Sequence, residues 1–403
     1  MNDLTAVTLP DSVTEIGNRA FSECIRLKSV NIPKNLKTMG DCAFEWCTEL
    51  TDLTIADGAA EIGYRAFEQC LALASVTIPG SVKTIGGCAF EECKMLTEVS
   101  MAEGVETIGY GAFRKCRKLA DISIPESVKS IGYDVCRDTA WLAAKREENP
   151  LVIVNNILID GVKAAGDVTV PDGVTEIAES AFEGSGLVSV SIPASVKRIG
   201  SGAFIGCKSL TAVKHAGNIT DWGAYAFNGC TSLKSFVIPE GTEKIDRHAF
   251  AYCDSLTEMI LPESVWTIGE YAFAECKNLS KIVILNPKCQ IHDDAATISS
   301  AQNIEEQKRV FSGTIYGFAG SAAQKYAEKY GYKFAEIQKG AAGDLNGDGS
   351  VTVSDAVLHA RIVAEDSTLE NADAKVLKAD LNGDGYITAE DTIMILRILA
   401  GKN

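Results

Sequence analysis

Two short stretches of oxygen-bearing side chains recur near the C-terminal end of this 403-residue sequence. Residues 344–349 read DLNGDG, and residues 380–385 repeat this motif 36 positions later. Oxygen ligands at loop positions 1, 3, 5, 7, 9 and 12, with glycine at position 6 for the sharp turn, wrap a hard cation such as Ca²⁺. We therefore predict two Ca²⁺ sites, whose ligands are Asp344, Asn346, Asp348, Ser350 through its carbonyl, Thr352 and Asp355 in one loop, and Asp380, Asn382, Asp384, Tyr386 through its carbonyl, Thr388 and Asp391 in the other.

The segments before and after each loop indicate which kind of calcium-binding domain the loops belong to. An amphipathic segment follows each loop, whereas the glycine-rich residues 339–343 before the first loop cannot form a stable entering helix. Loop plus exiting helix, duplicated within residues 344–402, resembles the type I dockerin domain, in which aspartate is usual at position 12. The resemblance implies calcium-dependent binding to a cohesin module of a scaffold protein, and so a place in a cellulosome. It also implies cohesin contacts from Val353, Ser354, Ala360, Arg361, Ala389, Glu390, Leu396 and Arg397.

The rest of the chain is a repeat. Ala-Phe pairs end at Phe21, Phe44, Phe67, Phe90 and Phe113, and again at Phe182, Phe204, Phe227, Phe250 and Phe273, with a period of 23 residues and one step of 22. Cysteine usually follows three residues later, leucine six later, and then a short apolar-polar-apolar strand. This pattern predicts a leucine-rich-repeat solenoid of about twelve turns. Cys136 stands where a phenylalanine is due, two periods before Phe182, so register is expected to continue through the degenerate stretch 138–166.

The repeat resembles the BspA-type leucine-rich repeats of bacterial surface proteins over roughly residues 4–285, and residues 314–334 look like the C-terminal ending of that family. We expect a helix over Ser321–Tyr330, a C-cap at Gly331 and a last strand. The predicted fold class is an α/β-type repeat solenoid followed by a small all-α dockerin. Its domains are the solenoid (1–285), a cap (286–337), a linker (338–343) and the dockerin (344–403).

Composition fits an exported binding protein. A net charge of −16 and a pI of about 4.8 argue against nucleic acid or an anionic membrane as partners. No run of about twenty apolar residues predicts a membrane span. No signal peptide is visible, and we expect an upstream signal to have been removed. Of the thirteen cysteines, nine hold one place in their turns, where parallel Cβ vectors about 4.8 Å apart favour a ladder of buried thiols over disulfides.

The central outward strand position changes character along the repeat. It is small and polar in the first half, at Asn31, Thr54, Thr77, Ser100 and Ser123, and apolar near the end, at Val237, Ile260 and Val283. Two interpretations stay open. The three aliphatic side chains form a binding strip for a partner protein, or residues 285–337 fold over them.

No catalytic constellation stands out, because the four histidines share no ligand or triad spacing. The sequence favours a non-catalytic extracellular protein-interaction module that a cohesin-bearing scaffold displays. One alternative is a component that degrades plant polysaccharide or peptide, with its active site in the irregular stretch 138–166. Another is a surface adhesin. The protein or carbohydrate ligand of the solenoid is not specified by these residues.

Overall fold

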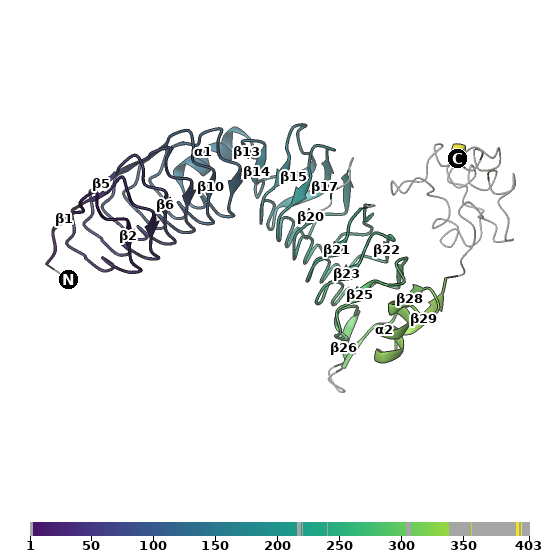
Figure 1. Ribbon diagram of the computed structural model, residues 1–403. Helices are drawn as coiled ribbons and strands as arrows, with labels where there is room; N and C mark the ends of the chain where they lie inside the picture. The colour runs from purple at the N-terminus through teal and green to yellow at the C-terminus, as the bar shows by residue number, and fades with distance from the viewer. Residues whose placement is uncertain are drawn as a thin grey trace. The chain divides into compact units, whose positions relative to one another are not determined.

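The computed structural model describes residues 3–215, 219, 221–239, 241–303 and 308–337, together with 356, 392–394 and 396. The chain divides into two compact units, which are considered separately. The N-terminal unit comprises 1–187 and 199–207, and the C-terminal unit comprises 188–198 and 208–403. Both units contain stacked solenoid turns with short parallel strands, about 14 turns in all (Figure 1).

Each regular turn of the N-terminal unit contributes two short strands rather than the one predicted. The longer strand buries alternate residues such as Val30 and Ile32, and it pairs with the next turn in a parallel register of 23 residues, as in Ser29 with Asp52. The longer strands are β1 (Ala6–Thr8), β3 (Ser29–Ile32), β5 (Asp52–Ile55), β7 (Ser75–Ile78), β9 (Glu98–Met101) and β11 (Asp121–Ser123).

A second ladder of two-residue strands follows in each turn. Its second residue, such as Ile85, is buried, and Thr84 pairs with Glu61 on one side and Thr107 on the other. These strands are β2 (Glu15–Ile16), β4 (Thr38–Met39), β6 (Glu61–Ile62), β8 (Thr84–Ile85), β10 (Thr107–Ile108) and β12 (Ser130–Ile131). Two ladders close each turn around one narrow apolar interior.

Between the short strand and the next long strand lies the corner, defined here as the five residues from two before to two after each repeat phenylalanine. The residues at both ends of a corner adopt the left-handed conformation, for example Arg65 (φ 53°) and Gln69 (φ 57°). This conformation lets three alternate N–H groups of the corner point at the following turn. Arg65, Phe67 and Gln69 donate to the carbonyls of Gly87, Ala89 and Glu91 at 2.9, 2.8 and 2.8 Å.

The corner phenylalanines form a buried column. Phe67 is fully buried and stacks on Phe44 and Phe90, each at a ring-centroid distance of 5.3 Å. Beside this column runs the predicted cysteine ladder. Its nine members and the other four cysteines are all buried and free. The Sγ atoms of Cys93 and Cys116 donate to the carbonyls of Phe67 and Phe90 in the preceding turns, at 3.2 and 3.0 Å. The thiol therefore acts as a hydrogen-bond donor as well as a small apolar group.

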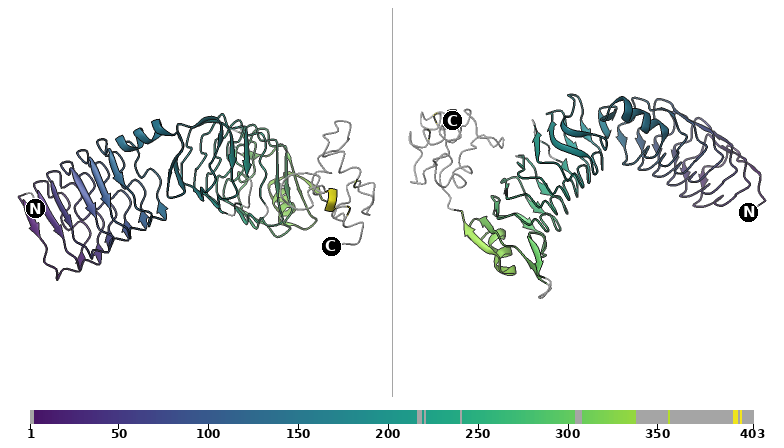
Figure 2. Two further views of the ribbon diagram at one scale, coloured as in Figure 1. Left: turned by 90° about the horizontal axis from the view of Figure 1, so that it is seen from above. Right: turned by 180° about the vertical axis from the view of Figure 1, so that it is seen from behind.

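The predicted continuous register through 138–166 is wrong, because both ladders stop there. The long ladder ends at β11 and the first short ladder at β12. Helix α1 (Ala140–Glu148) follows, with Thr139 as N-cap, and then the antiparallel hairpin of β13 (Val152–Val154) and β14 (Ile157–Asp160) (Figure 2). A new short ladder begins where Ile157 pairs with Glu176. The next strands are β15 (Ala165–Thr169), β16 (Glu176–Ile177), β17 (Gly186–Ile192) and β18 (Arg198–Ile199).

The C-terminal unit repeats the two ladders and closes them with a cap. Its strands are β19 (Ala212–His215), β20 (Asp221–Trp222), β21 (Lys244–Ile245), β22 (Glu258–Leu261), β23 (Thr267–Ile268), β24 (Lys281–Ile284), β25 (Gln290–Ile291), the antiparallel pair β26 (Ala301–Asn303) and β27 (Lys308–Val310), β28 (Thr314–Gly317) and β29 (Lys333–Glu336). One parallel sheet has the order β22-β24-β28-β29, so the last two strands extend the repeat sheet.

The predicted helical ending is confirmed. Helix α2 (Ala322–Tyr330) begins after Ser321, whose hydroxyl accepts from the N–H of Gln324, and ends at Gly331 in the left-handed conformation (φ 71°). The buried Tyr326 fixes the helix to the preceding segment, because its hydroxyl donates to the carbonyl of Asp294 at 2.7 Å.

We predict that Phe67→Ala destabilises the N-terminal unit by about 3–5 kcal/mol, since it removes a fully buried ring that contacts a ring on each side. Urea unfolding of the full chain, with the exposed Thr77→Ala as control, measures the difference. A loss below about 1 kcal/mol contradicts the column as a source of stability.

We predict that all thirteen thiols are free in denaturant without reductant, and that they react slowly in the native state. Burial raises the pKa of Cys47 and of Cys276 to about 12, so both remain protonated at neutral pH. Thiol titration in guanidinium chloride, with and without reductant, tests this count. Thiols that appear only after reduction show disulfides and contradict the free-thiol ladder.

Candidate functional site

The predicted apolar strip does not form one exposed surface. Val237 and Ile260 are half-buried, and Val283 is fully buried. Within the sheet, Val283 pairs with Ile260 on one side and with Tyr316 of β28 on the other. The prediction that Val283 contacts a partner protein is therefore wrong, because its side chain is fully buried. The alternative, that residues 285–337 fold over the strip, is supported at Val283, which pairs with β28, whereas Val237 and Ile260 remain predictions as partner contacts.

The outward face of the long strands in the N-terminal unit is hydrophilic. Thr54, Thr77 and Ser123 are exposed along its central row, and the neighbouring row carries the exposed carboxylates of Asp52, Glu98 and Asp121. This face offers hydroxyl and carboxylate oxygens to a partner.

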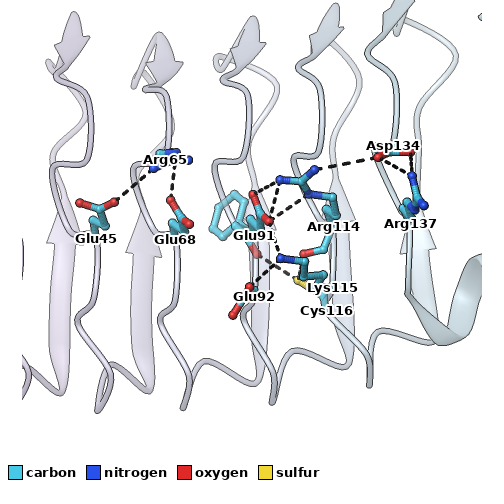
Figure 3. Close-up of polar contacts among 11 residues, drawn as sticks. Glu45, Arg65, Glu68, Glu91, Glu92, Arg114, Lys115, Cys116, Asp134 and Arg137 are labelled. Carbon is cyan, nitrogen blue, oxygen red and sulfur yellow. Dashed lines mark hydrogen bonds and ion pairs between the residues drawn. The ribbon is translucent and has the colours of Figure 1, made fainter. Parts of the chain in front are cut away.

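A row of charged side chains crosses the corners of successive turns (Figure 3). The position after each repeat phenylalanine is glutamate in three turns, at Glu45, Glu68 and Glu91. It is arginine in the next two, at Arg114 and at Arg137, which follows Cys136 in place of a phenylalanine. At the junction of the two signs, Arg114 donates to both carboxylate oxygens of Glu91 at 2.9 Å each. The partly buried Arg65 lies between the other two glutamates, with its Nε 3.1 Å from Glu68 and its Nη1 3.9 Å from Glu45.

The two most buried carboxylates of this row have opposite pKa shifts. Burial raises the pKa of Glu68 to about 6, since Arg65 only partly offsets the lost hydration and the neighbouring glutamates repel further charge. Burial alone would raise the pKa of Glu91 as well. The hydrogen bonds from Arg114 outweigh the effect of burial, so the pKa of Glu91 lies below its ordinary value. A split pair is typical of acid–base catalysis. Here each glutamate forms an ion pair with an arginine, and only 8% of Glu68 and 3% of Glu91 is exposed to solvent. This arrangement favours a structural role.

A cavity of about 270 Å³ lies in the N-terminal unit beside the insertion. Its apolar lining comes from Leu142 of α1, Ile159 of β14 and Val162. Arg146 and Asp160 form a bidentate ion pair across α1 and β14, at 2.8 and 2.6 Å. The sequence predicts the irregular stretch 138–166 but not this cavity. The one signal of the cavity in the sequence is Cys136, which stands in place of a repeat phenylalanine.

The two predicted ion loops, 344–355 and 380–391, lie outside the described residues, as do seven of the eight predicted cohesin contacts. The eighth, Leu396, is helical, and 49% of it is exposed. Within the described part of the chain, no group of three or more His, Cys, Asp and Glu side chains could hold a metal ion. A search of the same residues finds no helix with the length and apolar character that crossing a membrane requires.

Comparison with known families identifies the repeat. The family profile described as BspA type leucine-rich repeat region matches residues 1–59, 14–142 and 175–305, with six copies. These ranges cover more than half of the sequence. The chain belongs to the BspA-type leucine-rich-repeat family. The matched ranges leave out residues 143–174, where the structure has most of its insertion. A second profile, the type I dockerin domain, matches residues 342–400.

Solved structures include several similar leucine-rich-repeat proteins. A leucine-rich cell surface protein from Faecalibacterium prausnitzii is 32% identical, over 75% of this chain and 83% of that one, with a TM-score of 0.43. The pneumococcal vaccine antigen PcpA is 18% identical, over 84% and 90%, with a TM-score of 0.42. A protein from Bacteroides ovatus is 21% identical, over 83% and 92%, with a TM-score of 0.34. No curated protein matches the chain.

We predict that Glu68→Gln stabilises the N-terminal unit by about 1–2 kcal/mol at pH 7.5 and not at pH 4. The folded-state pKa of Glu68, about 6, lies above its ordinary value of 4.5. Its favourable contribution is therefore complete below pH 4.5 and is lost as pH rises through 6. Thermal unfolding at several pH values, with the exposed Glu49→Gln as control, tests this. An equal gain at both pH values contradicts the shift.

Proposed function

We propose that this protein is a non-catalytic extracellular recognition module, displayed on a cellulosome scaffold through calcium-dependent binding of its dockerin to cohesin. The observation that carries the proposal is the match of residues 342–400 to the type I dockerin domain, joined to a leucine-rich-repeat region in the same chain. A repeat protein with a dockerin combines a surface for one partner with an attachment for another.

The donor set of the two loops fits Ca²⁺. Each loop offers three carboxylates, one amide oxygen, one threonine hydroxyl and one backbone carbonyl, without a nitrogen or sulfur ligand. Oxygen donors of this kind suit a hard cation, which offsets the mutual repulsion of the carboxylates. We propose that each loop binds one ion, two in total. Binding would then hold the loops in the form that presents the cohesin contacts.

The described corners favour recognition over hydrolysis as the role of the solenoid. Glu68 and Glu91, which have the opposite pKa shifts that an acid–base pair needs, are both held by arginine and largely shielded from solvent. The hydroxyl- and carboxylate-bearing strand face, by contrast, is open to a partner.

The full chain should bind type I cohesin modules in calcium and lose that binding in excess EDTA. The double variant Asp344→Ala/Asp380→Ala, which removes the first ligand of each loop, should also lose binding. A matched control, Asp366→Ala/Asp373→Ala, removes two carboxylates of the same segment outside the loops and should bind as the parent does. Surface plasmon resonance against a cohesin panel measures all three. Binding that persists in EDTA, or no binding to any cohesin in calcium, overturns the proposal.

The two halves of the dockerin should contribute unequally to cohesin binding. Arg361 and Arg397 match, but the other paired contacts differ in size or charge, at Val353 and Ala389, Ser354 and Glu390, and Ala360 and Leu396. We therefore expect one of Arg361→Ala and Arg397→Ala to weaken binding about tenfold and the other less than about threefold. Isothermal titration calorimetry of each single variant gives the ratio. Equal losses show that the two faces are interchangeable and contradict this expectation.

A further inference from the structure

The three-bond contact between neighbouring corners recurs through the regular part of the N-terminal unit. Each corner donates the N–H groups of its first, third and fifth residues to alternate carbonyls of the next turn, namely those of the residue before the next corner and of its second and fourth residues. The last complete set before the insertion is donated by Gly111, Phe113 and Lys115 to the carbonyls of Tyr133, Val135 and Arg137, at 2.9, 2.8 and 2.7 Å. This contact satisfies buried backbone donors that would otherwise be costly.

The contact stops one turn later. In the corner 134–138, the N–H groups of Asp134, Cys136 and Asp138 have no hydrogen-bond partner among the described residues. Asp134 and Asp138 nevertheless keep the left-handed conformation of a regular corner, with φ of 55° and 61°. Cys136 is 1% exposed, so its N–H is one that water reaches poorly. This corner therefore has the backbone shape of a regular corner, but within the described ranges its three N–H groups lack the acceptors that the next turn supplies elsewhere.

The reason is that the next corner is missing. Its place is taken by Gly161, whose N–H donates to the carbonyl of Ala181 at 2.6 Å. A Cβ at position 161 would lie 2.3 Å from the ring of Phe182, so a phenylalanine cannot stand there. Two rings are thus absent from the column, at Cys136 and Gly161, and the chain between them leaves the stack as α1 and the hairpin (Figure 2).

The cavity of about 270 Å³ occupies this gap. Residues 134–137 line one side of it, and residues 180, 183 and 184 of the next regular corner, with the preceding residue 179, line another. On that second side the carbonyl of Glu183 stands where earlier corners accept an N–H, as Glu45 does from Glu23. The cavity lining therefore includes two of the three donor residues, Asp134 and Cys136, and the acceptor position at Glu183, together with apolar side chains of α1 and β14.

We propose that this cavity binds a short extended peptide segment of a partner protein, carrying a basic side chain, which takes the place of the missing corner. Donors at alternate residues require acceptors with the same repeat, and every second carbonyl of an extended peptide faces one side and supplies it, as in strand addition to a sheet edge. The ionisable lining consists of Asp134, Asp160, Glu179 and Glu183 against Arg137 and Arg146, a net charge of 2 − 4 = −2. This charge selects a cationic segment over an anionic one.

The Arg146–Asp160 ion pair gives the cavity a rigid wall. Both side chains are largely buried, with 23% and 12% of their surface exposed, and the two bonds fix α1 against β14. A preformed wall lowers the entropy lost on binding. The proposal gives the solenoid a ligand of its own and stands independently of the dockerin.

The test uses the full chain and an acetylated, amidated pentapeptide of sequence GKAKG, with GEAEG and lysine amide as comparison probes and cellohexaose as a carbohydrate probe. We expect GKAKG to bind at least about tenfold more tightly than GEAEG, lysine amide and cellohexaose. Binding should slow hydrogen exchange at the amides of Asp134, Cys136 and Asp138. Equal binding of lysine amide, preference for GEAEG or cellohexaose, or unchanged exchange at these amides overturns the proposal.

Two variants locate the site. Glu183→Lys reverses one charge of the lining and should weaken GKAKG binding at least about tenfold, whereas Glu147→Lys, on an exposed part of α1 outside the lining, should leave it unchanged. Cys136→Phe restores a ring to the gap and should abolish peptide binding. Unchanged thermal unfolding and cohesin binding show that each variant is folded and that the dockerin is intact. Full peptide affinity in folded Cys136→Phe and Glu183→Lys chains contradicts the assignment.

Discussion

Backbone hydrogen bonds between corners are the constraint on which the rest of this structure depends. To aim three N–H groups at the next turn, each corner places residues such as Arg65 and Gln69 in the left-handed conformation, which costs about 1 kcal/mol or more for a side chain other than glycine. Burial of the phenylalanine ring and the cysteine thiol offsets that cost. A corner is therefore stable against a neighbour of the same shape, and this requirement fixes the 23-residue period and the parallel register.

The same requirement explains which features could be predicted. Phe67 and Cys70 and their equivalents recur because every turn needs the same ring and the same thiol, so their spacing is visible without coordinates. The cap was also predictable, because Ser321 and Gly331 carry local signals for the two ends of α2. The second ladder was not, since two-residue strands such as Thr84–Ile85 have no periodicity of their own and arise only from stacking.

Other features depend on contacts that no local pattern encodes. Val283 has the composition of an exposed strip but lies inside a sheet that β28 extends, a pairing between residues 33 positions apart. The interruption after Cys136 was read as a degenerate turn because the count of two periods to Phe182 was correct. The ladders nevertheless break, since α1 and the hairpin replace a corner while preserving the length of chain between the regular turns. The number of residues between Cys136 and Phe182 does not by itself distinguish a degenerate turn of the solenoid from an insertion that replaces a turn.

This division of the chain separates its roles. Regular turns satisfy each other's backbone hydrogen bonds, and their surface includes the hydrophilic strand face and the charged row of Figure 3. The interrupted corner keeps a backbone edge for which the described part of the chain offers no acceptor, next to a cavity with a net negative lining. The dockerin match lies beyond the cap, apart in sequence from both. The proposed recognition and attachment roles therefore belong to separate parts of the sequence.

Hydrogen exchange of individual backbone amides in the full chain tests the central role of the corner contacts most directly. Phe113 and Cys136 occupy the same place in successive turns and are equally buried, at 0% and 1% exposure, but only Phe113 donates to a carbonyl of the next turn. Without added peptide, we expect the amide of Phe113 to exchange at least about 100-fold more slowly than that of Cys136. Equal protection of the two amides would mean that burial alone governs the corners, and it would contradict this account.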